Sequence, residues 1–305
     1  MKHFLKLLLA TTSLFLSFHA SAANAEPESA SKVAEAEAMM KAHEKDYTYG
    51  PASVRLLDQA TMSLQPGQAF IPPDVAVKLL TLAGAKLDDV KGFAGLVVPG
   101  IPGDEAPTDE WGAVAVIFKS TGFVRDDDAK TWDTGKILEG MRKSVEDRNQ
   151  EARKNGTPES VVNGWIEAPK YDDTTHRLVW AISTQDKGVP DSAIATYSSA
   201  ALGREGIMFF TFITEQAKLD SRKSLAVNML NGIEFDKGKR YVDFAEGTDR
   251  VAEIGLAALV GGVVAKKAGM FGMLALLLAK WGKIGAAAIG GLVAFKWRKK
   301  KNSAQ

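Results

Sequence analysis

The C-terminal part of the chain limits the possible folds most strongly, because it is too apolar for the surface of a soluble domain. Residues 254–265, 268–279 and 284–295 are three apolar runs separated by lysines. Each run is about 18 Å long as a helix, too short for a hydrocarbon core of about 30 Å. A single crossing therefore has to include Lys280 and Lys283. We expect a folded domain joined to a separate transmembrane helical segment.

This segment allows one membrane crossing or a two-helix hairpin. One crossing by residues near 268–295 buries two lysines, at roughly +5 to +7 kcal/mol on the insertion scale, but keeps the basic end 296–301 in the cytoplasm. A hairpin turning at Gly282 puts Trp281 at an interface and leaves that basic end outside. The charge and length arguments favour one crossing with the C-terminus inside.

Small residues recur every fourth position in this segment, a pattern that lets helices approach closely. They favour contact within a hairpin, self-association, or contact with a membrane protein partner. The two strips are Ala257, Gly261, Ala265 and Gly269, and Gly282, Ala286, Gly290 and Ala294.

The N-terminus has the order of a secretory signal peptide. Lys2 and Lys6 precede an apolar stretch, and small residues lead to Ala25. We predict cleavage after Ala25, with Ala22 as the competing site. The alternative is an uncleaved anchor, but the apolar stretch is short for a span.

Charge divides the chain into two unlike parts. Residues 26–250 hold 27 Lys and Arg against 36 Asp and Glu, a net of −9, whereas residues 251–305 hold 9 against 1, a net of +8. An acidic domain repels phosphate backbones, so nucleic acid is not an expected partner. There is no cysteine, and His43 and His176 lie far apart, so we expect no metal site and no cofactor.

These observations divide the chain into five parts and place its soluble domain outside the cytoplasm, in the periplasm if the source is Gram-negative. The expected parts are a signal peptide (1–25), a polar lead helix or linker (26–49), an extracytoplasmic α+β domain (50–250), an apolar membrane segment (251–297) and a basic tail (298–305).

Within the domain, period-two and period-3.6 patterns alternate. Residues 53–64 have strand character, and a helix is expected over 72–84, with prolines in its first turn. The stretch 111–124 is a near-continuous apolar run, typical of a central strand buried on both faces. A long helix follows at 132–155 and ends at Gly156.

Four strand-like runs then follow between residues 160 and 213, the last two joined by a tight turn at Gly203–Gly206. Short connections favour an antiparallel meander, with a second helix over 215–233 packed on it. The predicted fold class is therefore α+β, with a mainly antiparallel sheet and packed helices, not a doubly wound fold.

Asp126, Asp127 and Asp128 precede the long helix. A calcium loop needs a glycine and further oxygen donors at set spacing, which are missing here. We interpret the three aspartates as a solvated turn that caps this helix.

Four stretches carry a resemblance to a known family. They are WGAVAVIFKSTGFVRDDDA (111–129), GWIEAPKYDDTTHRLVWA (164–181), LGREGIMFF (202–210) and RYVDFAEGTDRVAEIGLAALVGGVVAKKAG (240–269). In this order they resemble the DUF2167 family, from about Gly50 to the tail. The resemblance implies a bacterial, membrane-anchored protein with a signal peptide and an apolar C-terminal segment. It implies no activity and no catalytic residues.

The sequence has no phosphate-binding loop and no G-x-S-x-G nucleophile motif. The polar and aromatic residues with most functional promise gather around one strand connection, where they could bind a sugar or a peptide. They are Trp165, Tyr171, Asp172, His176, Arg177 and Trp180. The alternative is that the tryptophans belong to the core and the polar members form a corner network; His176 alone could also be a general base or ligand. We expect a binding or envelope scaffold module, with a carboxylate-dependent hydrolase as the alternative.

Overall fold

The computed structural model describes residue 35 and residues 38–82, 91–99, 113–156, 158–220, 223, 227 and 232–260. The predicted signal peptide, the beginning of the polar lead, the apolar segment from residue 261 onward and the basic tail lie outside the described residues. Within the described ranges, no helix has the length and apolar character that a membrane span requires.

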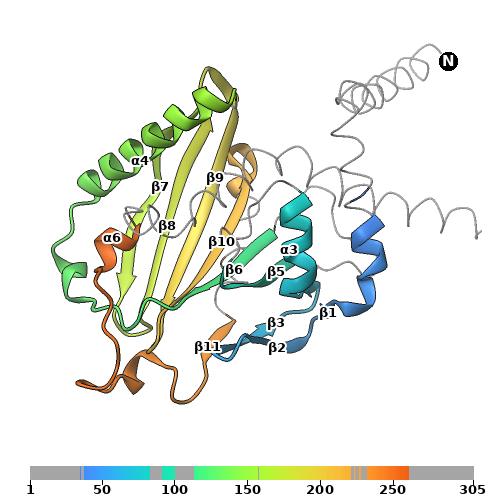
Figure 1. Cartoon of the computed structure of the whole chain (residues 1–305), viewed down its shortest axis with the longest axis vertical. Coiled ribbons are helices and arrows are strands. Elements are labelled where there is room, and N and C mark those ends of the chain that lie inside the picture. Colours follow the sequence, from blue (N-terminus) through green and yellow to red (C-terminus); the bar gives the residue numbers. More distant parts are fainter. Residues whose placement is uncertain are drawn as a thin grey trace, which may run out of the picture.

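An eight-stranded antiparallel sheet forms the centre of the domain (Figure 1). Its strand order is β1-β4-β5-β6-β10-β9-β8-β7. The strands are β1 (Thr48–Tyr49), β4 (Gln68–Ile71), β5 (Phe93–Pro99), β6 (Ala113–Lys119), β7 (Ser160–Asp172), β8 (Arg177–Asp186), β9 (Val189–Leu202) and β10 (Ile207–Glu215). Strand β6 lies between β5 and β10 and is buried from Val114 to Phe118, so the predicted central strand is confirmed.

The predicted meander is also confirmed. Strands β7 to β10 pair in sequence order, each antiparallel to the next. At the β9–β10 turn the backbone N–H of Gly203 donates to the carbonyl of Gly206 at 2.8 Å. The domain is thus α+β with a large antiparallel sheet, as its sequence pattern indicated.

A second sheet has three strands, β2 (Ala52–Leu56), β3 (Ala60–Leu64) and β11 (Ile233–Phe235), in the order β11-β3-β2. The strand character predicted over 53–64 is therefore a hairpin. Leu57 adopts φ 57°, the left-handed conformation that reverses the chain and that few non-glycine residues adopt.

The α-helices described over their whole length are α3 (Pro73–Leu82), α4 (Thr134–Asn155) and α6 (Leu256–Val260), and residues 38–42 of the polar lead are helical too. Short 3₁₀ turns are η1 (Glu44–Asp46), η3 (Asp127–Lys130), η4 (Gln216–Lys218) and η5 (Tyr241–Asp243). The predictions of α3 and α4 are confirmed, including Gly156, which ends α4 at φ 65°. Of the second helix predicted over 215–233, residues 219, 220, 223 and 227 are helical, whereas Glu215 ends β10, residues 216–218 form η4 and Ile233 begins β11. The other residues of this prediction, apart from a bend at residue 232, lie outside the described residues.

The predicted cap of α4 is wrong. The oxygen Oδ1 of Asp133 accepts hydrogen bonds from the backbone N–H groups of Gly135 and Lys136, so Asp133 caps this helix. Asp127 and Asp128 instead belong to η3. Sequence alone cannot separate these candidates, because any aspartate just before a helix can cap it.

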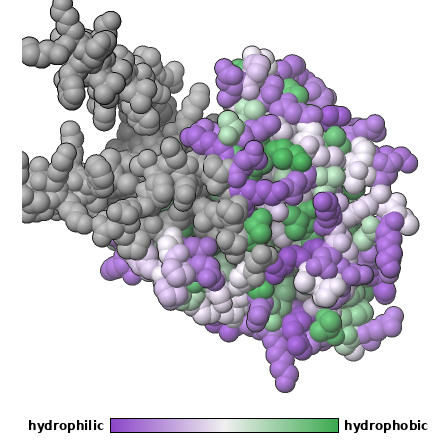
Figure 2. All heavy atoms as spheres, turned by 180° about the vertical axis from the view of Figure 1, so that it is seen from behind, coloured by the Kyte–Doolittle hydropathy of each residue, from purple (hydrophilic) through white to green (hydrophobic). Residues whose placement is uncertain are grey.

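The large sheet is covered on both faces. Helices α3, α4 and α6 pack on one face, which includes Leu178, Trp180 and Phe209. The small sheet packs on the other, which includes Phe210 and Phe212. On the view from behind, the coloured hydrophobic residues form separate small groups among hydrophilic ones (Figure 2).

Residues 251–260, grouped by sequence with the apolar segment, pack on the domain. Phe123 pairs with Val251, and the N–H of Ala252 donates to the carbonyl of Phe123 at 2.8 Å. Leu256, Leu259 and Val260 of α6 are buried in the core that α4 also lines. The first turn of the apolar stretch is therefore part of the domain core.

Candidate functional site

Residues from the four stretches quoted for the family resemblance meet at one end of the domain. We call this cluster the joint. It consists of Phe123, Asp126, Tyr171, His176, Arg204, Glu205, Tyr241, Phe244 and Asp249. It connects the end of β6, the β7–β8 turn, the β9–β10 turn and the segment that leads to α6.

Four rings form a stacked column in the joint. The ring centroids of Phe244 and Phe123 are 3.9 Å apart, those of Phe123 and Tyr241 4.4 Å, and those of Tyr241 and His176 4.1 Å. Each such aromatic pair contributes about 0.5–1.5 kcal/mol beyond its buried area. The column therefore fastens the η5 segment to the end of β6 and to the β7–β8 turn.

A hydrogen-bonded chain lies beside this column. The Tyr171 hydroxyl donates to Oδ2 of Asp126 at 2.7 Å, and Nδ1 of His176 lies 3.2 Å from the same hydroxyl oxygen. The phenol has one proton, which the carboxylate accepts, so Nδ1 of His176 has to be the donor in the second bond. In the neutral ring, Nε2 then holds the lone pair.

The surroundings of these hydrogen-bonded side chains favour the protonated form of the Tyr171 phenol. Burial, and next the hydrogen bond to Asp126, raise the pKa of Tyr171 far above its usual range. Burial and the nearby Asp126 also raise the pKa of Tyr241, whose hydroxyl donates to the carbonyl of Val124 at 3.0 Å. His176 has φ 49°, so the backbone turns sharply to bring its ring onto Tyr241.

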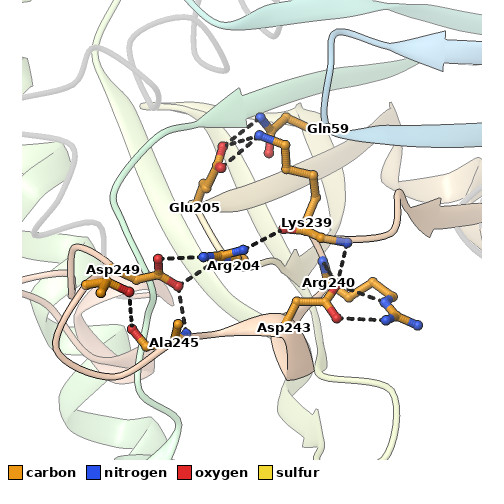
Figure 3. A network of polar contacts seen from close by, with 10 residues as sticks. Gln59, Arg204, Glu205, Lys239, Arg240, Asp243, Ala245 and Asp249 are labelled. Atoms are coloured by element: carbon orange, nitrogen blue, oxygen red, sulfur yellow. Dashed lines mark hydrogen bonds and ion pairs between the residues drawn. The ribbon is translucent and has the colours of Figure 1, made fainter.

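Arg204 and Asp249 form a two-bond ion pair in the joint (Figure 3). Nε of Arg204 donates to Oδ2 of Asp249 at 2.6 Å, and Nη2 donates to Oδ1 at 2.8 Å. The N–H of Ala245 also donates to this carboxylate. These bonds, with that from Arg204 first, lower the pKa of Asp249. Nη1 of Arg204 reaches the carbonyl of Gly238 at 3.3 Å.

Further charged pairs surround this contact (Figure 3). Glu205 accepts from Nζ of Lys239 at 2.7 and 2.8 Å and from Nε2 of the buried Gln59 at 3.1 Å, which lowers the pKa of Glu205. Arg240 donates twice to Asp243, three positions later. Each carboxylate labelled in Figure 3 thus accepts from a nearby side chain: Asp249 from Arg204, Asp243 from Arg240, and Glu205 from Lys239 and Gln59.

The six residues predicted as a binding cluster do not come together. Tyr171 and His176 lie in the joint. Asp172 caps its own turn, accepting from the backbone N–H groups of Thr174 and Thr175 and from the Thr175 hydroxyl, and these bonds lower its pKa.

The other three lie elsewhere. Trp180 is buried in the core, and Nε1 of Trp165 donates to the carbonyl of Thr134 in the first turn of α4 at 3.1 Å. Arg177 lies on the opposite face of the sheet, where Nη2 donates to the carbonyl of Ile233. Their role in binding stays a prediction.

Sequence reasoning did not single out Phe123, Arg204, Tyr241, Phe244 or Asp249 as site residues. The signal that could have found them is that all five lie within the stretches that carry the family resemblance. Across the described ranges, no group of three or more His, Cys, Asp or Glu side chains is arranged to hold a metal ion.

The fold and the joint define an α+β domain with a C-terminal segment fastened to it. Comparison with family models then gives the family: the model "Protein of unknown function (DUF2167)" matches residues 48–290, so the chain belongs to this family. Among curated proteins, none matches the sequence.

Solved structures give distant matches. Cyanobacterial PsbP (CyanoP) from Synechocystis sp. PCC 6803 is 14% identical, with a TM-score of 0.35, covering 62% of this chain and 91% of that one. The Saccharomyces cerevisiae Ran-binding protein Mog1p is 15% identical, with a TM-score of 0.33, covering 64% and 98%.

Proposed function

We propose that the chain is an exported, membrane-anchored protein of the bacterial cell envelope, whose α+β domain is a binding or scaffold module outside the cytoplasm. The signal peptide at 1–25 directs export, and the apolar segment after residue 260 holds the domain at the cytoplasmic membrane. In a Gram-negative cell the domain faces the periplasm. The partner is the lipid bilayer, with a membrane protein or a second copy as further candidates.

One observation carries this proposal: the path of residues 236–260. This stretch is fastened to the β9–β10 turn by Arg204 and to the end of β6 by the aromatic column, and it then enters the core as α6. The rest of the apolar segment follows from residue 261 onward. The joint therefore secures the part of the chain that leads to the proposed anchor.

The bonding within the joint favours a binding or scaffold role over catalysis. A catalytic group has to be within reach of a substrate atom in a usable protonation state. Here Arg204 and Glu205 are bonded to Asp249 and Lys239, and Tyr171 is bonded to Asp126. These bonds connect segments of the domain, so they account for the residue types without a reaction.

A fusion to alkaline phosphatase tests the proposal, because this enzyme is active only after export. The fusion point should follow Val260, since the domain core extends to that residue. We expect an active fusion found in the soluble extracytoplasmic fraction, while the full chain stays with membranes. An inactive fusion, or a full chain released without detergent, contradicts the proposal.

A carboxylate-dependent hydrolase acting on an envelope substrate is the second candidate. The hydrogen bonds from Tyr171 to Asp126 and from His176 to Tyr171 favour this function. They leave the lone pair of the His176 ring on Nε2, and the His176 side chain is 23% exposed. Such a ring could accept a proton. Incubation of the full chain with isolated cell-wall sacculi and phospholipid vesicles tests this. Products that disappear in Asp126→Asn support it, and unchanged substrates contradict it.

A further inference from the structure

Four hydroxyl side chains lie together on the face of the large sheet on which α4 packs. Ile182 marks this face, because it packs against Met141 and Val145 of α4. Thr196 lies opposite Ile182 in the β8–β9 register, so its side chain is on the same face. Alternation along the strands and register between them add three more hydroxyl groups. We call these four residues the hydroxyl patch: Thr184, Thr196, Ser198 and Thr211.

Most of the hydroxyl patch is buried in a face that is otherwise apolar. Thr196, Ser198 and Thr211 are 5%, 2% and 3% exposed. The oxygen Oγ1 of Thr196 is buried and has no hydrogen-bond partner. A buried hydroxyl without a partner destabilises a fold, so this group is in want of a ligand that completes its bonding.

Arg148 adds a positive charge to the same region. It continues the buried stripe of α4, three positions after Val145 and seven after Met141, where helical spacing favours an apolar residue. Its side chain is only partly exposed, and burial lowers the pKa of the guanidinium. Within the described part of the chain Arg148 has no ion pair and no hydrogen bond. A half-buried charge of this kind lacks the anion that normally accompanies it.

The orientation of α4 turns Arg148 toward the patch. Asn149 and Arg142 bond to the backbone of β7, so their side of the helix lies along the β7 edge of the sheet. Successive helical residues are about 100° apart, which places Arg148 about 100° from Asn149 and about 120° from Arg142. Met141 and Val145, which pack on the sheet, lie between these two sides. Arg148 therefore lies on the side of α4 nearer to β8 and β9.

The border of the patch is partly open and lined by apolar side chains. Thr184, Ile194 and Ile213 are partly exposed there. Glu215, at the end of β10 on the same face, is paired with Lys218 and so has its own counter-ion. A ligand that enters at this border meets apolar surface and hydrogen-bond donors together.

We propose that Arg148 and the hydroxyl patch bind the anionic headgroup of an amphiphile, a carboxylate or phosphate group on an apolar chain. The inference names a ligand class for the binding module proposed above and rests on that role. A guanidinium pairs with a carboxylate or phosphate through two bonds, and hydroxyl groups donate further bonds to the same oxygens. The apolar chain then lies against Ile182, Ile194 and Ile213. A free fatty acid and a phospholipid of the bilayer both carry this chemistry.

The test is native mass spectrometry of the full chain in micelles of a neutral detergent. The probes are decanoate for the free acid, phosphatidylglycerol for the phospholipid, and decanol as the uncharged comparison. We expect a bound adduct with at least one anionic probe and none with decanol. An adduct with decanoate alone assigns the site to free acids, and one with phosphatidylglycerol alone assigns it to lipid.

Two variants separate ligand binding from a structural role. In Arg148→Met the apolar length is kept and the charge removed, so the affinity for the anionic probe should fall at least about tenfold. Its Tm without probe should equal or exceed that of the wild type, because an unpaired half-buried charge destabilises the free domain. Lys143→Met, at an exposed position of the same helix, is the matched control and should bind as the wild type does.

Three results overturn the site: no adduct with either anionic probe, equal binding in Arg148→Met, or equal binding of decanol. A Tm several degrees lower in Arg148→Met without probe also overturns it, because Arg148 then stabilises the fold. The membrane anchor is judged separately by whether the full chain stays with membranes. Loss of probe binding with membrane attachment intact thus contradicts the ligand site alone.

Discussion

Arg204 and Asp249, 45 positions apart in the sequence, form a two-bond ion pair that joins the β9–β10 turn to the segment leading to α6. The carboxylate also accepts from the N–H of Ala245, so it holds the 245–249 turn closed. Paired bonds between a guanidinium and a carboxylate combine charge with fixed geometry, and they are among the stronger polar contacts in proteins. This pair therefore acts as the main polar fastener of the joint.

Removing one partner of this pair should destabilise the domain. In Asp249→Asn the charge is lost and Arg204 keeps at most weaker bonds, so we expect the Tm to fall by several degrees, on the order of 5 °C. The matched control is Arg240→Ala, which breaks an exposed pair three positions apart and should change the Tm by less than about 2 °C. Differential scanning calorimetry measures both; equal shifts in the two variants would argue against the role given to Asp249.

The Arg204–Asp249 pair should make the stability of the domain depend on pH. Arg204 lowers the folded-state pKa of Asp249, and Lys239 lowers that of Glu205. A carboxyl group with a lowered folded pKa stabilises the fold above its unfolded value, about 4, and this contribution is lost as pH falls through the folded value. We expect the free energy of unfolding by urea to decline below about pH 4–5.

In Asp249→Asn that decline should be shallower, because one fewer group takes up a proton on unfolding. The measurement is the urea midpoint and slope at a series of pH values between 6 and 3. Parallel declines in the wild type and the variant would show that Asp249 does not contribute to acid sensitivity.

The Asp128 carboxylate should control the docking of α6. Asp128→Ala leaves the N–H groups of Leu256 and Ala257 without their acceptor, at a cost of about 1 kcal/mol, the usual range for a lost helix cap being about 0.5–2 kcal/mol. Asp127→Ala, at the exposed neighbouring aspartate, should cost less than about 0.5 kcal/mol. Limited proteolysis should cut residues 251–260 faster in the first variant only; equal cleavage in both would contradict the capping role.

The Tyr171 hydroxyl should matter for stability. Tyr171→Phe keeps the ring and removes the hydroxyl between Asp126 and His176, so we expect a loss of about 1 kcal/mol in urea unfolding. Tyr47→Phe, which removes a single bond to the carbonyl of Met40, is the comparison. Unchanged stability in Tyr171→Phe, combined with a lost cellular function, would instead favour the ligand-binding interpretation of this residue.

Local pattern was enough to predict several elements. Helices α3 and α4, strand β6 and the turn at Gly203–Gly206 were predicted because their signals come from residues close together in the sequence. Those signals are the spacing of apolar residues along the helices, the continuous apolar run of β6 and the two glycines of the turn. The strands that were not predicted are β1, β4, β5 and β11, and their place in a sheet depends on distant partners. Strand β11, for example, pairs with β3 across more than half of the chain.

The joint could not be predicted for the same reason. Asp126 and Tyr171 are 45 positions apart, and Tyr241 bonds to the carbonyl of Val124 from 117 positions away. Contacts between residues so far apart leave no period-two or period-3.6 pattern in the sequence. The predicted cluster around 165–180 joined residues that are close in sequence, but alternation along β8 places Arg177 and Trp180 on opposite faces of the sheet.

The most direct test of the central claim, an exported domain held by one C-terminal crossing, is paired cysteine labelling in spheroplasts. Ser53→Cys reports on the domain and Ser303→Cys on the basic tail, and the parent chain has no cysteine. A membrane-impermeant maleimide should label position 53 in intact spheroplasts and label position 303 only after the membrane is permeabilised, because the basic end stays inside. Labelling at both positions would replace the single crossing with a hairpin, and protection of position 53 in intact spheroplasts would contradict export of the domain altogether.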